Sequence, residues 1–89
     1  MRIPTIDQFN KWSFQDKCWF VDYETGGRYK EMNAEDGFPI IVYPKENVAI
    51  VFKVDRKGVL TEAEAMELTE AKSKLVQFDA AWKAMSTYN

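Results

Sequence analysis

Two runs of β-branched and aromatic residues, 38–43 and 48–54, are separated by the segment Pro44-Lys45-Glu46-Asn47. β-Branched and aromatic side chains favour strands, whereas proline and asparagine beside charged residues are typical of turns. In the second run, every even-numbered position from 48 to 54 is apolar, which is the period of a strand with one buried face. The sequence therefore predicts an antiparallel hairpin whose even-numbered face packs on a helix.

The C-terminal third has the composition of a long helix. Thr61-Glu62-Ala63-Glu64 has the pattern of an N-terminal capping box, and residues 62–86 contain neither glycine nor proline. Apolar residues then recur at spacings of three and four, which places them on one stripe of a helix. This stripe consists of Leu68, Ala71, Leu75, Phe78, Trp82 and Met85. We expect a helix over 62–86, entered through the turn 55–58, that packs on the sheet.

The N-terminal half predicts one short helix and a second hairpin. Thr5 can cap a helix over 6–12, and the aromatic and β-branched residues of 17–24 favour a strand. If Trp19, Val21 and Tyr23 share the face of this strand that packs on the helix, Phe20 lies on the opposite, open face. Gly26-Gly27 suits a two-residue turn, after which 28–32 would return as a strand. The predicted fold class is α+β: a two-layer, four-stranded antiparallel sheet of two hairpins, with a short N-terminal helix and a long C-terminal helix packed on one face.

Length and cysteine content bound the architecture and the compartment. A chain of 89 residues is expected to form a single domain over 1–89, and its 46% hydrophobic residues can fill the core. Cys18 is the only cysteine, so no internal disulfide can form and a reducing cytoplasm is expected. We expect its thiol to be buried and unreactive. Residues 1–5 do not form an apolar segment, and no apolar run of the sequence is long enough to span a membrane, so we expect neither a leader nor a membrane span.

The absence of histidine limits the chemistry that the chain can perform. Histidine is the commonest metal ligand and the usual carrier of protons near neutral pH, and the chain has none. Gly26-Gly27 followed by Arg28 lacks the remaining residues of a phosphate-binding loop. We therefore predict no enzyme activity, no cofactor and no metal. An enzyme that uses carboxylates alone stays a distant alternative, which would require two converging, partly buried carboxylates in a cleft.

Surface features then point to a binding function. If one face of a two-layer sheet is uncovered, apolar side chains on it would form an exposed patch of the kind that contacts other proteins. Charged helix positions and the last turn of the predicted C-terminal helix offer further contacts. The residues predicted to bind a partner are Phe20, Tyr43, Arg28, Tyr29, Glu62, Glu64, Glu67 and Trp82.

The predicted function is a small non-enzymatic protein-binding module. It would act as an inhibitor or adaptor of the phage or mobile-element type that occludes a surface of a larger host protein, such as a nucleic-acid-processing or defence enzyme. One alternative is a single-stranded nucleic-acid binder that uses the aromatic residues of 9–29, although a net charge of −2 gives no basic footprint. Another alternative is a homo-oligomeric structural component.

Overall fold

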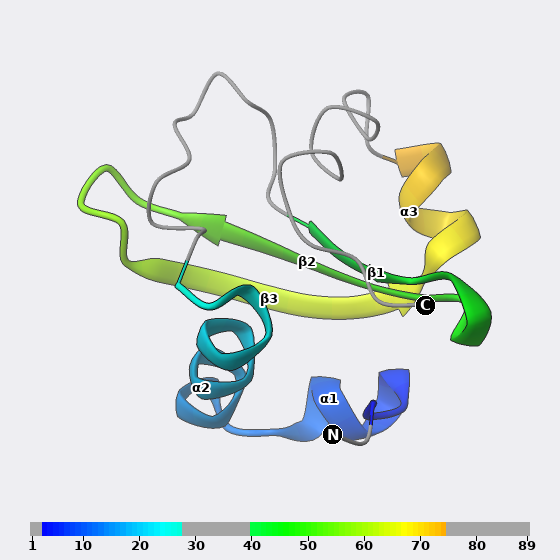
Figure 1. Ribbon diagram of the computed structural model, residues 1–89, viewed down its shortest axis with the longest axis horizontal. Coiled ribbons are helices and arrows are strands. Elements are labelled where there is room, and N and C mark those ends of the chain that lie inside the picture. The colour runs from blue at the N-terminus through cyan, green and yellow to red at the C-terminus, as the bar shows by residue number, and fades with distance from the viewer. Residues whose placement is uncertain (1–2, 28–39, 75–89) are drawn as a thin grey trace.

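The computed structural model describes residues 3–27 and 40–74, which form an α+β fold. Within these residues, three antiparallel strands form one sheet in the order β1-β2-β3. Figure 1 shows α1 and α2 on one side of the sheet, whereas α3 follows β3 and rises on the other side. The elements are α1 (Ile6–Lys11), α2 (Phe14–Thr25), β1 (Ile40–Tyr43), η3 (Pro44–Glu46), β2 (Val48–Val54), β3 (Leu60–Glu67) and α3 (Leu68–Lys74).

The hairpin predicted around residues 44–47 is confirmed. Strands β1 and β2 pair in register from Ile40 opposite Val51 to Tyr43 opposite Val48. The turn is a short 3-10 helix, η3, followed by Asn47 in the left-handed region with a φ of 56°. Asparagine tolerates this backbone conformation better than most residues, so the turn is encoded locally.

Strand β3 corrects the prediction of a long C-terminal helix. Residues 60–67 pair with β2 as a second hairpin instead of beginning a helix. Its tight turn is closed by Asp55, whose carboxylate accepts hydrogen bonds from the backbone N–H groups of Lys57 (2.8 Å) and Val59 (3.0 Å). Gly58 adopts a φ of 82° in this turn, a conformation that glycine accepts at little cost.

The predicted C-terminal helix is a helix over only part of its length. In the described part of the chain it is limited to α3, and its continuation over 75–86 lies outside the described residues. Leu68 and Ala71, the first two members of the predicted apolar stripe, are buried against the sheet. This part of the stripe is therefore buried as expected, but on the face of the sheet opposite to the one predicted.

Helix α1 is confirmed, whereas α2 replaces a predicted strand. The Thr5 side chain accepts a hydrogen bond from the Gln8 backbone (3.1 Å), and the Gln8 side chain accepts one from the Thr5 backbone (3.0 Å), so a capping box begins α1. Residues 17–24, predicted to be a strand, lie in α2. Their predicted partner, 28–32, lies outside the described residues. The prediction of a four-stranded sheet is therefore wrong, because the sheet formed by the described residues has three strands and 17–24 is not one of them.

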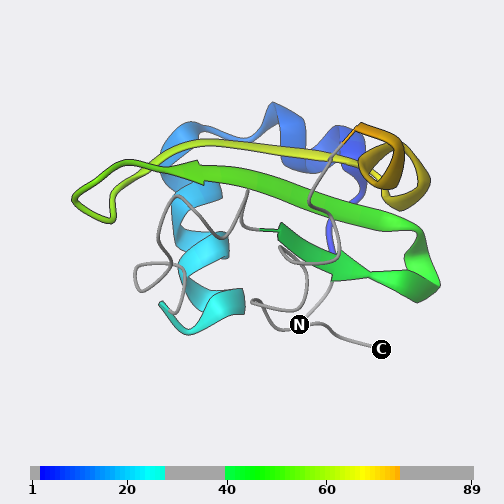
Figure 2. The ribbon, with the colours of Figure 1, turned by 90° about the horizontal axis from the view of Figure 1, so that it is seen from above.

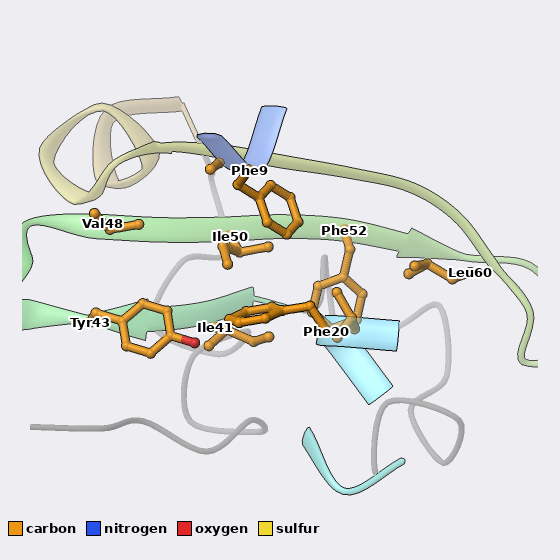
Figure 3. Close-up of a cluster of buried hydrophobic side chains, with 10 residues drawn as sticks. Phe9, Phe20, Ile41, Tyr43, Val48, Ile50, Phe52 and Leu60 are labelled. Atoms are coloured by element: carbon orange, nitrogen blue, oxygen red, sulfur yellow. The ribbon is translucent and has the colours of Figure 1, made fainter. Parts of the chain in front are cut away.

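Side chains on both faces of the sheet are buried. On one face, Ile41, Ile50 and Phe52 pack with Phe9 of α1 and Phe20 of α2 (Figure 3). On the opposite face, the sheet residues pack with the beginning of α3. That second cluster contains Ile40, Val42, Ala49, Met66, Leu68 and Ala71. Two predictions are thus wrong. The even-numbered face of β2 packs on α1 and α2, whereas the described part of the C-terminal helix, α3, lies on the opposite face. Within residues 3–27 and 40–74, both faces of the sheet also carry buried clusters, so neither is the open apolar surface that was expected.

Candidate partner-binding surface

Two residues predicted to anchor a partner, Phe20 and Tyr43, lie in the core. Each side chain is 1% exposed. The Phe20 ring makes edge-to-face contacts with Phe9 and Trp12, at centroid distances of 5.8 and 5.6 Å. The expectation that Phe20 projects from an uncovered sheet face is therefore wrong. Its ring instead fills the space between α2 and the sheet.

Three predicted acidic residues are exposed, but they do not share a helix face. Glu62, Glu64 and Glu67 lie on β3, where side chains alternate between the two faces of the sheet. Glu62 and Glu64 therefore share one face, and Glu67 projects to the other. Glu62 also forms an exposed ion pair with Lys53 at 3.4 Å.

The remaining predicted site residues, Arg28, Tyr29 and Trp82, lie outside the described residues.

Helix α2 carries an exposed aromatic pair. The side chains of Trp19 and Tyr23 are 61% and 60% exposed, which is unusual for two such large rings. Their rings are stacked, with centroids 5.7 Å apart and planes inclined by 25°. Residues four apart lie on the same face of a helix, so the two rings form one continuous apolar surface on α2.

The helical period explains why these rings face outward. Phe20, Val21 and Glu24 are buried on the side of α2 that faces the sheet. Because a helix repeats every 3.6 residues, positions 19 and 23 then lie on the solvent side. As a strand, the segment would have placed Trp19 and Tyr23 on the same face as Val21.

The sequence contains local capping signals for α2, although the strand propensity of its aromatic residues predicts a strand. Ser13 accepts a hydrogen bond from the Asp16 backbone N–H at 3.2 Å, which is the serine N-cap that begins many helices. Gly26 ends the helix with a φ of 60°, and the N–H of Gly27 donates to the carbonyl of Asp22 at 3.2 Å. A Gly-Gly pair marks a helix C-cap as readily as it marks a hairpin turn. The combination of Ser13 and Gly26 locates the ends of α2, but it does not identify the exposed face, because large apolar side chains lie on both sides of this helix.

Acidic side chains border the aromatic pair. Asp16 and Asp22 are exposed and lie three residues on either side of Trp19, so they share its side of the helix. Cys18 is partly buried, and this burial raises the pKa of its thiol above the ordinary value of 9.0, with the negative charge of Asp22 raising it further. A thiol with a raised pKa stays protonated near neutral pH and is a poor nucleophile. The surface around Trp19 therefore offers aromatic area and negative charge.

Two further features of the described residues bear on binding. No three histidine, cysteine, aspartate or glutamate side chains within 3–27 and 40–74 gather closely enough to hold a metal ion. Of the helices in the same two ranges, none has the length and apolar character needed to cross a bilayer.

Comparisons with known proteins returned no family model, no curated protein and no solved structure that matches this chain. The function is therefore argued from the residues of the chain itself.

Proposed function

We propose that the protein is a non-catalytic protein-binding module whose anchor is the stacked Trp19–Tyr23 pair on α2. The observation that supports this proposal is the exposure of both stacked rings on a helix that is capped at both ends. Tryptophan and tyrosine dominate the energetically important positions of protein interfaces. Covering most of both rings would contribute a few kcal/mol to association at about 25 cal/mol per Å² of apolar area.

The charges around the pair favour a partner with basic side chains. An arginine or lysine of the partner could lie over the face of either ring and also approach Asp16. The same carboxylate would repel the phosphate groups of a nucleic acid. This arrangement supports a protein partner over single-stranded DNA or RNA. An adaptor or inhibitor that occludes the surface of a larger cytoplasmic protein is the role that we propose.

Affinity capture with and without the two rings tests the proposal. The full chain and its W19A/Y23A variant would each be used to capture partners from a lysate, once with and once without nuclease treatment. We expect a stoichiometric protein partner with the wild-type chain and its loss with the double variant. Because both side chains are exposed, the free energy of unfolding should change by no more than about 1 kcal/mol, which urea denaturation would check.

A matched control uses Val59, another exposed apolar residue, which lies in the turn between β2 and β3. The Val59→Ala variant should capture the same partner as the wild-type chain. Equal capture by wild type and W19A/Y23A would contradict the proposal. Capture that disappears with nuclease would favour the nucleic-acid alternative, and recovery of the chain with itself alone would favour a homo-oligomer.

A further inference from the structure

The outer edge of β3 is closed at one residue by a side chain. The amide of Asn10 in α1 donates a hydrogen bond to the carbonyl of Ala65 (2.9 Å) and accepts one from its N–H (2.8 Å). Both backbone groups of Ala65 therefore point away from β2, toward the free side of the sheet. Asn10 makes the pair of bonds that a neighbouring strand would make.

Ala63 presents the same groups two residues earlier along the strand. In an antiparallel ladder the backbone groups alternate between the two edges, so the N–H and C=O of Ala63 point in the same direction as those of Ala65. Ala63 lies opposite Phe52 in the register, as a pair without mutual hydrogen bonds. Within residues 3–27 and 40–74, no group forms hydrogen bonds with the N–H and C=O of Ala63 as Asn10 does with those of Ala65.

An open groove lies beside this stretch of edge. It has a volume of about 580 Å³ and is lined by Ala63, by Glu62 and Glu64 on either side of it, and by Phe14 and Lys17 of α2. The Phe14 ring is 48% exposed, so it offers apolar area to an occupant. The course of β3 past α1 and α2 is visible from two directions in Figures 1 and 2.

The hollows along the edge are predominantly acidic. A second hollow of about 660 Å³ adjoins the first at Asn10 and Glu64. Five carboxylates line the two hollows, against the two ammonium groups of Lys17 and Lys53. Two of the five already form ion pairs, Glu62 with Lys53 at 3.4 Å and Glu70 with Lys74 at 3.1 Å, so negative charge still predominates. The five are those of Asp7, Glu62, Glu64, Glu67 and Glu70.

We propose that the β3 edge at Ala63 accepts an extended, basic peptide segment of a partner protein as an additional strand. Proteins usually cover or block the unpaired edge of a sheet, because it pairs readily with other chains. Here Asn10 blocks the edge at Ala65 and leaves it open at Ala63, beside a groove. Backbone pairing at Ala63 gives the segment its extended form, and lysine or arginine side chains meet the carboxylates. This site is separate from the aromatic surface of α2.

Hydrogen exchange on the ¹⁵N-labelled full chain tests this proposal. The probe is a synthetic peptide of alternating lysine and valine, added at millimolar concentration. We expect exchange of the Ala63 amide to slow at least tenfold, while exchange of the Ala65 amide, which is already hydrogen-bonded, stays unchanged. A peptide with glutamate in place of lysine should not bind. Two further peptides would carry N-methyl groups, one at every lysine amide and the other at every valine amide. In an extended peptide these two sets of amides point to opposite edges, and only one edge faces β3. One of the two peptides should therefore bind at least tenfold more weakly than the other.

Variants separate this site from the aromatic surface. Ala63→Pro removes the outward N–H and should weaken peptide binding at least tenfold. Because proline also perturbs the strand, the E62Q/E64Q variant provides a second test, with binding expected to weaken most at low salt. Trp19→Ala should leave peptide binding unchanged. The proposal is overturned by unchanged Ala63 exchange at saturation, by chemical-shift changes confined to Trp19 and Tyr23, or by no binding at millimolar peptide.

Discussion

The Asn10 side chain replaces a strand at one point on the sheet. Its two hydrogen bonds to Ala65 join residues 55 positions apart in the sequence. An asparagine amide carries a donor and an acceptor on one plane, so it can satisfy both backbone groups of one residue. Nothing about Asn10 in the sequence marks this role, because the contact depends on how α1 lies against β3.

Asn10→Ala should lower the free energy of unfolding by about 1–2 kcal/mol, because it leaves the partly buried N–H and C=O of Ala65 without a protein partner. Urea denaturation measures this change. Lys11→Ala, an exposed substitution on the same helix, is the control and should stay within about 0.5 kcal/mol of wild type. Equal stabilities of the two variants would show that the Asn10 bonds do not contribute.

At the scale of elements, two segments adopt the structure opposite to the one that their composition favours. Residues 17–24 are rich in aromatic side chains but form a helix, and residues 60–67 are rich in alanine and glutamate but form a strand. Intrinsic propensities differ by less than about 1 kcal/mol per residue, so caps and pairing partners decide such cases. Ser13 and Gly26 bound the helix, and β2 supplies the partner of the strand.

Phe20→Ala and Trp19→Ala distinguish the helix from the predicted strand. Because Phe20 is buried and Trp19 is exposed, Phe20→Ala should cost about 3–5 kcal/mol of unfolding free energy and Trp19→Ala no more than about 1 kcal/mol. A strand with Trp19 facing the core would give the reverse order. Urea denaturation of the two variants, monitored by far-ultraviolet circular dichroism, makes the comparison.

At the scale of the whole molecule, the sheet carries buried side chains on both faces. Neighbouring residues of β1 belong to different clusters: Ile41 packs with α1 and α2, and Val42 with the residues that begin α3. The two-layer prediction missed this because it placed both the N-terminal and the C-terminal helix on the same face of the sheet. Burying both faces gives a small chain more apolar contact per strand than a two-layer arrangement allows.

Substitutions at adjacent positions of β1 test this architecture. Ile41→Ala should cost about 2–5 kcal/mol and Val42→Ala about 1.5–3 kcal/mol of unfolding free energy, because both side chains are buried. Lys45→Ala, in the exposed turn after β1, is the control. Thermal or urea unfolding would show both effects. A Val42→Ala variant as stable as the control would mean that one face of the sheet is open after all.

The candidate surface was only partly accessible to sequence reasoning. The aromatic richness of 9–29 indicates a binding surface in this segment, but the predicted strand exchanges the rings that face solvent with those that face the core. Phe20 is buried, whereas Trp19 and Tyr23 are exposed. The exchange follows directly from reading a strand in place of a helix, because the period of the structure decides which side chains share a face.

Local sequence patterns by themselves determine the β1–β2 hairpin and helix α1. The β1–β2 hairpin follows from alternation and the turn at 44–47, and α1 follows from the capping box of Thr5 and Gln8. Contacts between distant segments decided the rest: pairing with β2 made 60–67 a strand, and packing on the sheet selected the outward face of α2. The physical reason is one of magnitude. Propensity contributes tenths of a kcal/mol per residue, whereas burial of a single large side chain contributes about 1.5–3 kcal/mol.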